Sequence, residues 1–222
     1  MTDKNCWWIQ TFTGRAFDLS SPQPEQVCTE DIAHALANCC RYAGHSRWHY
    51  SVAQHSLLVA EIVAATDPEL ALAALLHDAA EAYIGDWSSP LKALMRQGRE
   101  SSTLFLTPTH AVPGPPIDLN PSTPRWSPWS PLDVEQAVER AIGKRFNVDL
   151  VTRNPVIKAA DLIALATEKR DLFGPAPRDG WGDSTGFEMP EPLTRRILRV
   201  TPEVAELAFL DAFRWGYGRD VK

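Results

Sequence analysis

Apolar residues recur along the chain with the spacing of buried helices, and polar start signals precede these runs. Ser51 and Gln54 form a capping-box pattern, which predicts that His55 lies in the first turns of a helix. Similar signals predict further helices that begin near Thr29, Asp67-Pro68, Ser89-Pro90, Ser130-Pro131, Asn154-Pro155 and Thr201-Pro202. Residues 8–19, which turn at Gly14, have the pattern of a small β-hairpin. The chain is therefore predicted to be all-α with one N-terminal hairpin.

Two long segments lack a helical period. The first, at about 98–131, is rich in proline and forms either a disordered loop or an arm at the active site or at an oligomer contact. The second spans 174–192. Large apolar side chains in both segments predict a homo-oligomer, at least a dimer, because a lone domain rarely leaves such groups uncovered: Trp126, Trp129, Trp181 and Phe187. Residues 1–222 are otherwise expected to form a single domain with one core.

Composition narrows the choice of partners. The net charge of -6 disfavours binding to a long nucleic acid, which requires a broad basic surface, but leaves room for a small anionic substrate. The four cysteines lack the spacing of a zinc knuckle, and the N-terminus does not resemble a signal peptide. No apolar run approaches the roughly 20 residues of a membrane span. We therefore expect a cytoplasmic protein with no membrane partner.

Four polar residues interrupt otherwise apolar helical runs. They are His55, His77, Asp78 and Asp161, and they come from three different runs. Buried polar and charged groups are costly unless they are paired or bind a metal, so their joint occurrence predicts one shared site. Imidazole and carboxylate groups are ligands of divalent transition metals, which lower the pKa of a bound water.

These residues resemble the H...HD...D pattern of the HD-domain phosphohydrolase superfamily, over roughly residues 8 to 172. The resemblance implies an HD-type helical bundle with one divalent transition metal (Co, Mn, Fe, Zn or Ni) at the four residues. Residues 75–86 and 90–92 are similar to the bacterial 5'-deoxynucleotidases of this superfamily, in which a glutamate and an aspartate follow the HD aspartate after three and eight residues. Glu81 and Asp86 occupy those positions here.

Three further segments, 31–34, 41–45 and 50–56, resemble a phage-enriched branch that includes a dATP triphosphohydrolase. This resemblance suggests dATP or dAMP as the first substrates to test, and a bacterial or phage-infected cell as the setting. The deoxynucleotidases carry an Arg-Trp pair fourteen to fifteen residues before the first metal histidine, where this chain has Cys40-Arg41. Its own Arg47-Trp48 pair lies nearer, so we expect sugar or base selection to differ.

The chemistry assigns a role to each candidate. Glu81 would orient a water or shuttle a proton, unless it is a solvated acid at a helix end. Asp86 would position the same water or protonate the leaving oxygen, unless it is a turn or cap residue. Candidate phosphate contacts are Lys92 and Arg47, followed by Arg41 and His45, while Trp48 is a candidate for stacking on a base or for core packing.

The expected function is metal-dependent hydrolysis of the 5' phosphoester of 2'-deoxynucleotides, either monophosphates or triphosphates. Two alternatives remain open at this stage. An HD-fold oxygenase would bind two irons through additional histidines, and no second cluster of histidines at helical spacing is visible. A non-catalytic nucleotide-binding or assembly protein would be favoured by a missing metal ligand, and none is missing.

Overall fold

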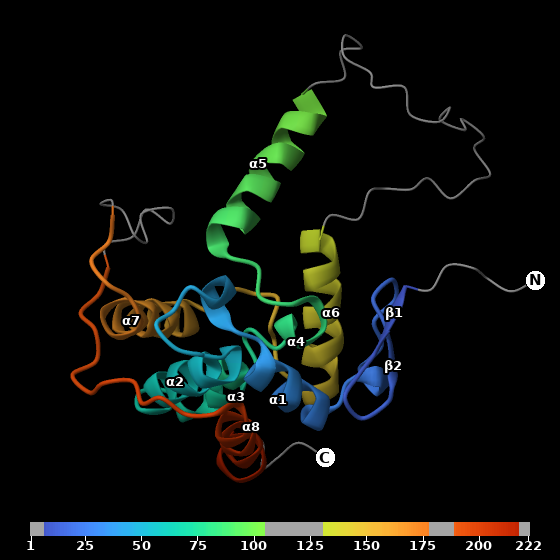
Figure 1. Ribbon diagram of the computed structural model, residues 1–222. Coiled ribbons are helices and arrows are strands. Elements are labelled where there is room, and N and C mark those ends of the chain that lie inside the picture. The colour runs from blue at the N-terminus through green and yellow to red at the C-terminus, as the bar shows by residue number, and fades with distance from the viewer. Residues whose placement is uncertain (1–6, 105–130, 178–188, 218–222) are drawn as a thin grey trace, which may run out of the picture.

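The computed structural model describes residues 7–104, 131–177 and 189–217, and of residues 98–104 and 215–217 it describes the backbone alone. The tryptophans and the phenylalanine on which the oligomer prediction rests therefore lie outside the described residues. Most of the described chain is helical (Figure 1). The α-helices are α1 (Thr29–Asn38), α2 (Val52–Ala64), α3 (Ala71–Leu75), α4 (Glu81–Ile84), α5 (Ser89–Leu104), α6 (Pro131–Phe146), α7 (Pro155–Leu172) and α8 (Pro202–Asp211).

Shorter elements complete the architecture. Strands β1 (Trp8–Gln10) and β2 (Ala16–Asp18) form an antiparallel hairpin in which Ile9 is opposite Phe17. Short 3-10 helices occur at Pro24–Gln26, Arg41–Gly44 and Pro68–Leu70, and a π-helical turn at Ala212–Tyr217 follows α8. The prediction of an all-α fold with a small N-terminal hairpin is confirmed. None of the helices within the described ranges is both long enough and apolar enough to cross a membrane.

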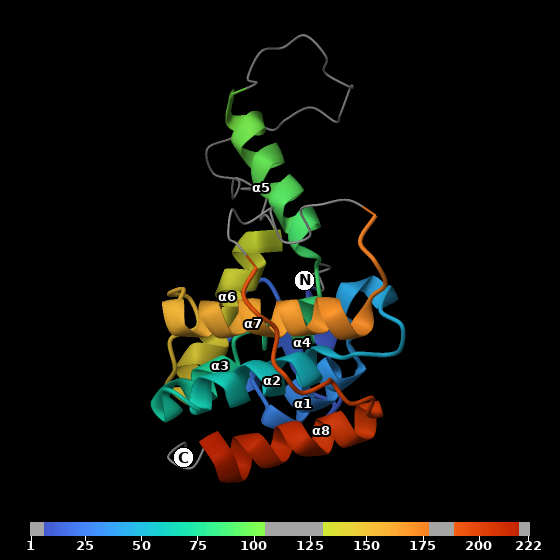
Figure 2. The same ribbon diagram turned by 90° about the vertical axis from the view of Figure 1, so that its left-hand side faces the viewer.

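Helix α2 lies at the centre of the packing. It contacts α1, α3, α7 and α8, and Figure 2 shows α7 on one side of it and α8 on the other. The core around it is fully buried at Leu36, Val59, Leu75 and Ile142. Since α2 carries His55, this arrangement places the imidazole in the interior with no exposed surface.

The hairpin is attached to the helices by aromatic contact. The ring of Phe17, on β2, stacks on the ring of Tyr83, on α4, with 3.8 Å between the ring centroids. Both side chains are buried, so the contact adds apolar area to the core as well as ring stacking. It secures the short helix that begins at Glu81.

The helix starts agree with the sequence where the signal is local. The Ser51 hydroxyl accepts a hydrogen bond from the Gln54 backbone N–H, and the Gln54 side-chain oxygen accepts one from the Ser51 backbone N–H, so the capping box is complete. The Asn154 carboxamide likewise accepts from Val156 N–H and Ile157 N–H at the start of α7. Asp67 starts only a 3-10 turn, and its side chain makes no capping bond.

Two boundaries differ from the prediction. The apolar helix that was expected to carry His77 and Asp78 ends at Leu75, so both residues lie in the turn that leads to α4. Helix α5 continues past Gly98 to Leu104, because residues 98–104 contain no proline to stop it, and the proline-rich segment follows only afterwards. α5 projects from the body of the molecule in both ribbon views (Figures 1 and 2).

We predict that a buried acid of α6 limits stability at alkaline pH. Burial raises the pKa of Glu139 to about 7, whereas an ordinary glutamate has a pKa of 4.5. The neutral form is favoured in the folded protein, so this stability is fully present below pH 4.5 and is lost as the pH rises through about 7. Glu139→Gln should therefore raise the free energy of unfolding by about 1 kcal/mol at pH 8, with little effect at pH 5.

Urea unfolding at the two pH values measures this difference. Glu69→Gln is the matched control, because Glu69 is exposed and its side chain makes no ion pair with the described residues. Equal effects of Glu139→Gln at pH 5 and pH 8 would contradict the prediction.

Candidate metal centre and active-site cavity

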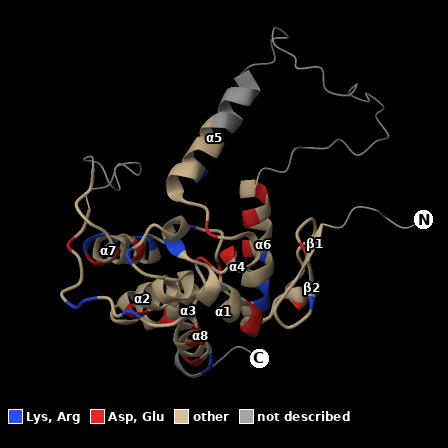
Figure 3. Cartoon of the chain, in the orientation of Figure 1, with Lys and Arg blue, Asp and Glu red and all other residues tan. Residues whose placement is uncertain are grey.

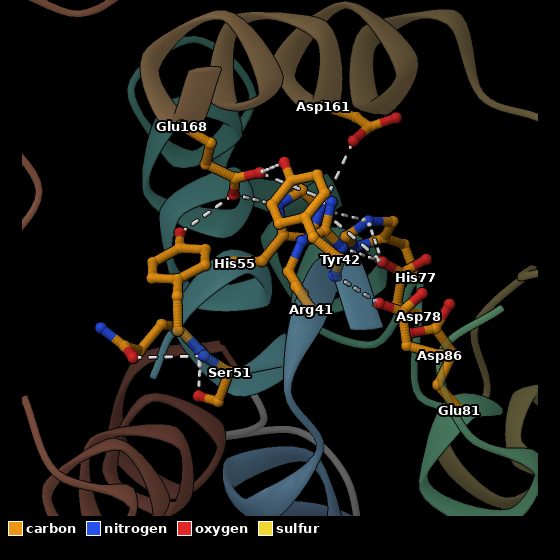
Figure 4. Close-up of polar contacts among 12 residues, drawn as sticks. Arg41, Tyr42, Ser51, His55, His77, Asp78, Glu81, Asp86, Asp161 and Glu168 are labelled. Carbon is orange, nitrogen blue, oxygen red and sulfur yellow. Dashed lines mark hydrogen bonds and ion pairs between the residues drawn. The ribbon is translucent and has the colours of Figure 1, made fainter. Parts of the chain in front are cut away.

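Side chains from α2, the α3–α4 turn and α7 converge on one point. His55 Nε2 lies 3.3 Å from His77 Nε2, 3.6 Å from Asp78 Oδ2 and 3.4 Å from Asp161 Oδ1. His77 Nε2 lies 3.3 Å from Asp78 Oδ2. His55, His77 and Asp78 form a group that could hold a metal ion, and Asp161 closes it from α7 (Figure 4). The structure thus brings together all four residues that the sequence singled out.

The spacing and the ring orientations fit a single metal ion. Two ligand atoms that each lie about 2.1 Å from one ion are themselves roughly 3.0 to 3.4 Å apart, close to the separations seen here. His77 Nδ1 lies 2.7 Å from the Ala74 carbonyl oxygen, which can only accept a hydrogen bond. This bond puts the proton on Nδ1 and leaves the lone pair of Nε2 facing the other ligands.

The charges around this point also favour a cation. Burial opposes ionisation of Asp78, but His77, His55 and Arg41 hold the pKa of its carboxyl well below the usual range. The pKa of Asp161 is lowered as well, against its burial, chiefly by His55. Burial and the Arg41 charge disfavour protonation of His55, yet the carboxylates of Glu168 and Asp161 outweigh them and raise its pKa to about 9. The carboxylates therefore remain ionised and draw positive charge to the centre.

Glu168 supports the centre from behind and was not identified from the sequence. Its carboxylate is fully buried and accepts hydrogen bonds from His55 Nδ1 at 2.7 Å, from the Tyr50 hydroxyl at 3.0 Å and from the Tyr42 hydroxyl. Arg41 Nη2 lies 3.5 Å from it. The available signal was spacing, since Glu168 follows Asp161 by seven residues, two turns along one helix face.

The segment before α2 links this network to the candidate acids. Tyr42 and Ala43 have φ values of 58° and 50°, a left-handed conformation that is strained for residues other than glycine. The Tyr42 N–H donates to Asp86 Oδ2 at 3.2 Å, and Arg41 Nη1 lies 3.4 Å from Asp78 Oδ2. The turn that carries Arg41 and Tyr42 thus contacts both Asp78, a candidate metal ligand, and Asp86.

The buried Glu81 and the partly buried Lys92 form an ion pair beside the centre. Glu81 is 5% exposed, so it is not the solvated acid of the alternative interpretation. Its Oε1 lies 3.5 Å from Lys92 Nζ, while its buried Oε2 has no hydrogen-bond partner among the residues that the structure describes. Burial, together with the charges of Asp78 and Asp86, raises the pKa of Glu81 well above its ordinary value. Lys92 Nζ also lies 2.7 Å from Oε1 of Glu135, a partner that the sequence did not suggest.

A cavity of about 470 Å³ opens over these groups. It is within the range of about 300–1,000 Å³ that is usual for small-molecule sites. Its lining includes the following predicted site residues: His77, Asp78, Asp161, Glu81, Asp86, Lys92 and Arg41. The cavity therefore joins the candidate metal ligands to both candidate acids.

Three predicted substrate contacts are not part of this lining. Arg47 is exposed and lines a separate hollow of about 460 Å³ beside Phe173. His45 is exposed, and its backbone N–H donates a hydrogen bond to the Tyr42 carbonyl oxygen at 3.0 Å. Trp48 is half-buried, with an indole N–H that has no partner within the described part of the chain. Their contact with substrate stays a prediction. They follow the left-handed residues Tyr42 and Ala43 in the chain, whereas Arg41, which precedes them, lines the cavity.

Comparison with known proteins identifies relatives but no activity. No family model matches the chain. YfdR of Escherichia coli (strain K12), an uncharacterized protein, is 34% identical over 165 residues, which cover 74% of this chain and 72% of YfdR. RCAP_rcc00048 of Rhodobacter capsulatus, also uncharacterized, is 30% identical over 210 residues, or 89% of each chain. The chain belongs to the same family as these two proteins. Because both relatives are uncharacterized, a proposal about the reaction has to rest on the geometry of the site.

We predict that Glu168→Gln weakens metal binding without unfolding the protein. The substitution removes the charge that orients His55, and loss of such a supporting contact typically lowers metal affinity by about 10 to 100-fold. Titration with Co²⁺ and Mn²⁺ measures the affinity, and circular dichroism checks the fold. Glu203→Gln, at an exposed position on α8, is the matched control. Unchanged affinity in Glu168→Gln would show that the network does not support the metal.

Proposed function

We propose that this protein is an HD-domain phosphohydrolase that uses a divalent transition metal to cleave the 5' phosphoester of 2'-deoxynucleotides. The observation that carries the proposal is the convergence of His55, His77, Asp78 and Asp161 beneath a cavity that also holds two further acids. The order of these residues along the chain matches the HD pattern, and their geometry fits one ion. The nature of the substrate rests on the resemblance of residues 75–92 to deoxynucleotidases.

A bound divalent ion would supply charge neutralisation at the phosphate and would lower the pKa of a water molecule. The protein groups then have separate tasks. Glu81, with one oxygen that has no hydrogen-bond partner among the described residues, orients the attacking water toward the phosphorus and accepts a proton from it. Asp86, fixed by the Tyr42 N–H, delivers a proton to the departing 5' oxygen. Lys92 stabilises the ionised form of Glu81 and holds its position.

The alternatives gain no support from the described residues. An HD-fold oxygenase requires ligands for a second iron, and within the described ranges only His55, His77 and Asp78 form a group of side chains close enough to share a metal ion. His34, one of the remaining histidines, lies on α1 and is not part of the cavity lining. Its ring stacks on Phe12 and is hydrogen-bonded to Glu206. A non-catalytic binding protein has no need for a buried acid with an unpaired oxygen beside a metal centre.

We predict that Asp78→Ala loses both the metal and the activity. The substitution removes a ligand that the surrounding positive groups keep ionised. Metal content by mass spectrometry, together with release of phosphate or triphosphate from deoxynucleoside mono-, di- and triphosphates, measures the two effects. Asp211→Ala, at an exposed position on α8, is the control. Full metal content and activity in Asp78→Ala would overturn the site assignment.

We predict that Glu81→Ala separates the chemistry from the metal. Metal content should stay at the wild-type level, since Glu81 is not among the converging ligands, whereas turnover should fall by about 10² to 10⁴-fold, as is typical for a group that transfers a proton. Glu69→Ala is the control at an exposed position. A loss of turnover smaller than about threefold would remove Glu81 from the mechanism.

A further inference from the structure

The cations in the cavity lining fall into two groups. Three of them are committed to carboxylates: Arg41 to Glu168 and Asp78, Lys92 to Glu135 and Glu81, and Lys158 to Asp161 at 2.8 Å. These ion pairs make Lys92 less available for contact with phosphate than the sequence suggested. If Lys92 moved toward a ligand, it would leave two buried carboxylates without their cation, which is costly.

Arg96 and Arg153 form the second group. Both line the cavity and both are exposed. No hydrogen bond or ion pair joins either of them to a residue in the described ranges, although the charge of Arg153 partly offsets the effect of burial on the pKa of Glu139. Arg96 comes from α5, whereas Arg153 comes from the loop that leads into α7, so two separate elements supply them. Figure 3 shows basic segments along α7 and at the base of α5. The sequence pattern had drawn attention to neither residue.

An exposed arginine that is not held in a close ion pair is suited to binding phosphate. The guanidinium group is planar, is always charged and can donate two parallel hydrogen bonds to phosphate oxygens. The N-terminal end of α7 lines the same cavity through its cap residue Asn154 and through Ile157 and Lys158, and the helix dipole adds to the attraction for an anion. The net charge of the protein is -6, so the two arginines and the helix N-terminus form a local region of positive potential. Such a region is what binding of a small polyanion requires.

We propose that Arg96 and Arg153 bind the outer phosphates of a nucleoside triphosphate, so that the substrate class of this site is the triphosphate. The inference rests on the proposed function. In the reaction, the oxygen of water forms a bond to the α-phosphorus while the bond from that phosphorus to the 5' oxygen breaks. One proton of the water passes to the 5' oxygen, and the products are a deoxynucleoside and tripolyphosphate. A monophosphate would fill the inner site and leave both arginines without a ligand.

Binding of inorganic anions tests the outer site directly. Titration calorimetry of the metal-loaded protein is expected to show tighter binding of tripolyphosphate than of orthophosphate. Arg96→Gln combined with Arg153→Gln should weaken tripolyphosphate binding by about tenfold or more, since each charged hydrogen bond contributes measurably, and should change orthophosphate binding by less than about threefold. Arg199→Gln is the matched control, because Arg199 is exposed, lies outside the cavity lining and makes no ion pair with the described residues.

Kinetics separates this inference from the proposed function. With deoxynucleoside triphosphates, the double variant should raise the Michaelis constant by about tenfold, with little change in turnover, while its kinetics with monophosphates should stay near wild type. An equal loss with both substrates, or equal binding of the two inorganic anions by the wild type, would overturn the outer site. Failure of the proposed function has a different signature, in which the wild type releases neither phosphate nor tripolyphosphate from any deoxynucleotide.

Discussion

The carboxylate of Glu168, with no exposed surface, accepts hydrogen bonds from His55 and from two tyrosines and pairs with Arg41. A buried charge is tolerated only when it is paired and its oxygens are satisfied, so these contacts have to form together. They join α7 to α2 and to the segment that precedes α2. Since α2 is the central helix, the position of the His55 imidazole, and with it the candidate metal centre, depends on this buried network around Glu168.

The same network accounts for the strained turn at Tyr42. A left-handed conformation at Tyr42 and Ala43 persists only when the surrounding structure compensates for its cost. The Tyr42 hydroxyl is bound to Glu168, and its N–H is bound to Asp86. The strained conformation therefore lets Tyr42 contact two groups at once. These are Glu168, which holds the candidate metal ligand His55, and Asp86, which lines the cavity. The orientation of Asp86 is coupled to the orientation of His55 through a single backbone segment.

Sequence reasoning succeeded where the signal is local or energetically extreme. The capping residues Ser51 and Asn154 were predicted because their hydrogen bonds reach only two or three residues ahead. The converging polar residues were predicted because buried histidine and aspartate in apolar runs require compensation. The break of the helix before His77 and the pairing of Lys92 with Glu135 were missed, since both depend on packing between distant segments. The HD-type bundle, the metal and the substrate stay predictions that the comparisons leave open.

The division of charge within the cavity is consistent with the proposed binding of a polyanion by an acidic protein. Cations near the metal centre are bound to fixed carboxylates, so they hold the acids in place and add little attraction for a ligand. A transition metal at the centre would add the positive charge that the inner carboxylates lack. Farther out, where solvent weakens the cost of an unpaired charge, arginines remain available. The inner cations therefore hold the acids in place, and under our proposal the outer arginines bind phosphate. One set of cations cannot perform both tasks, because a cation that is paired with a carboxylate has little attraction left for a ligand.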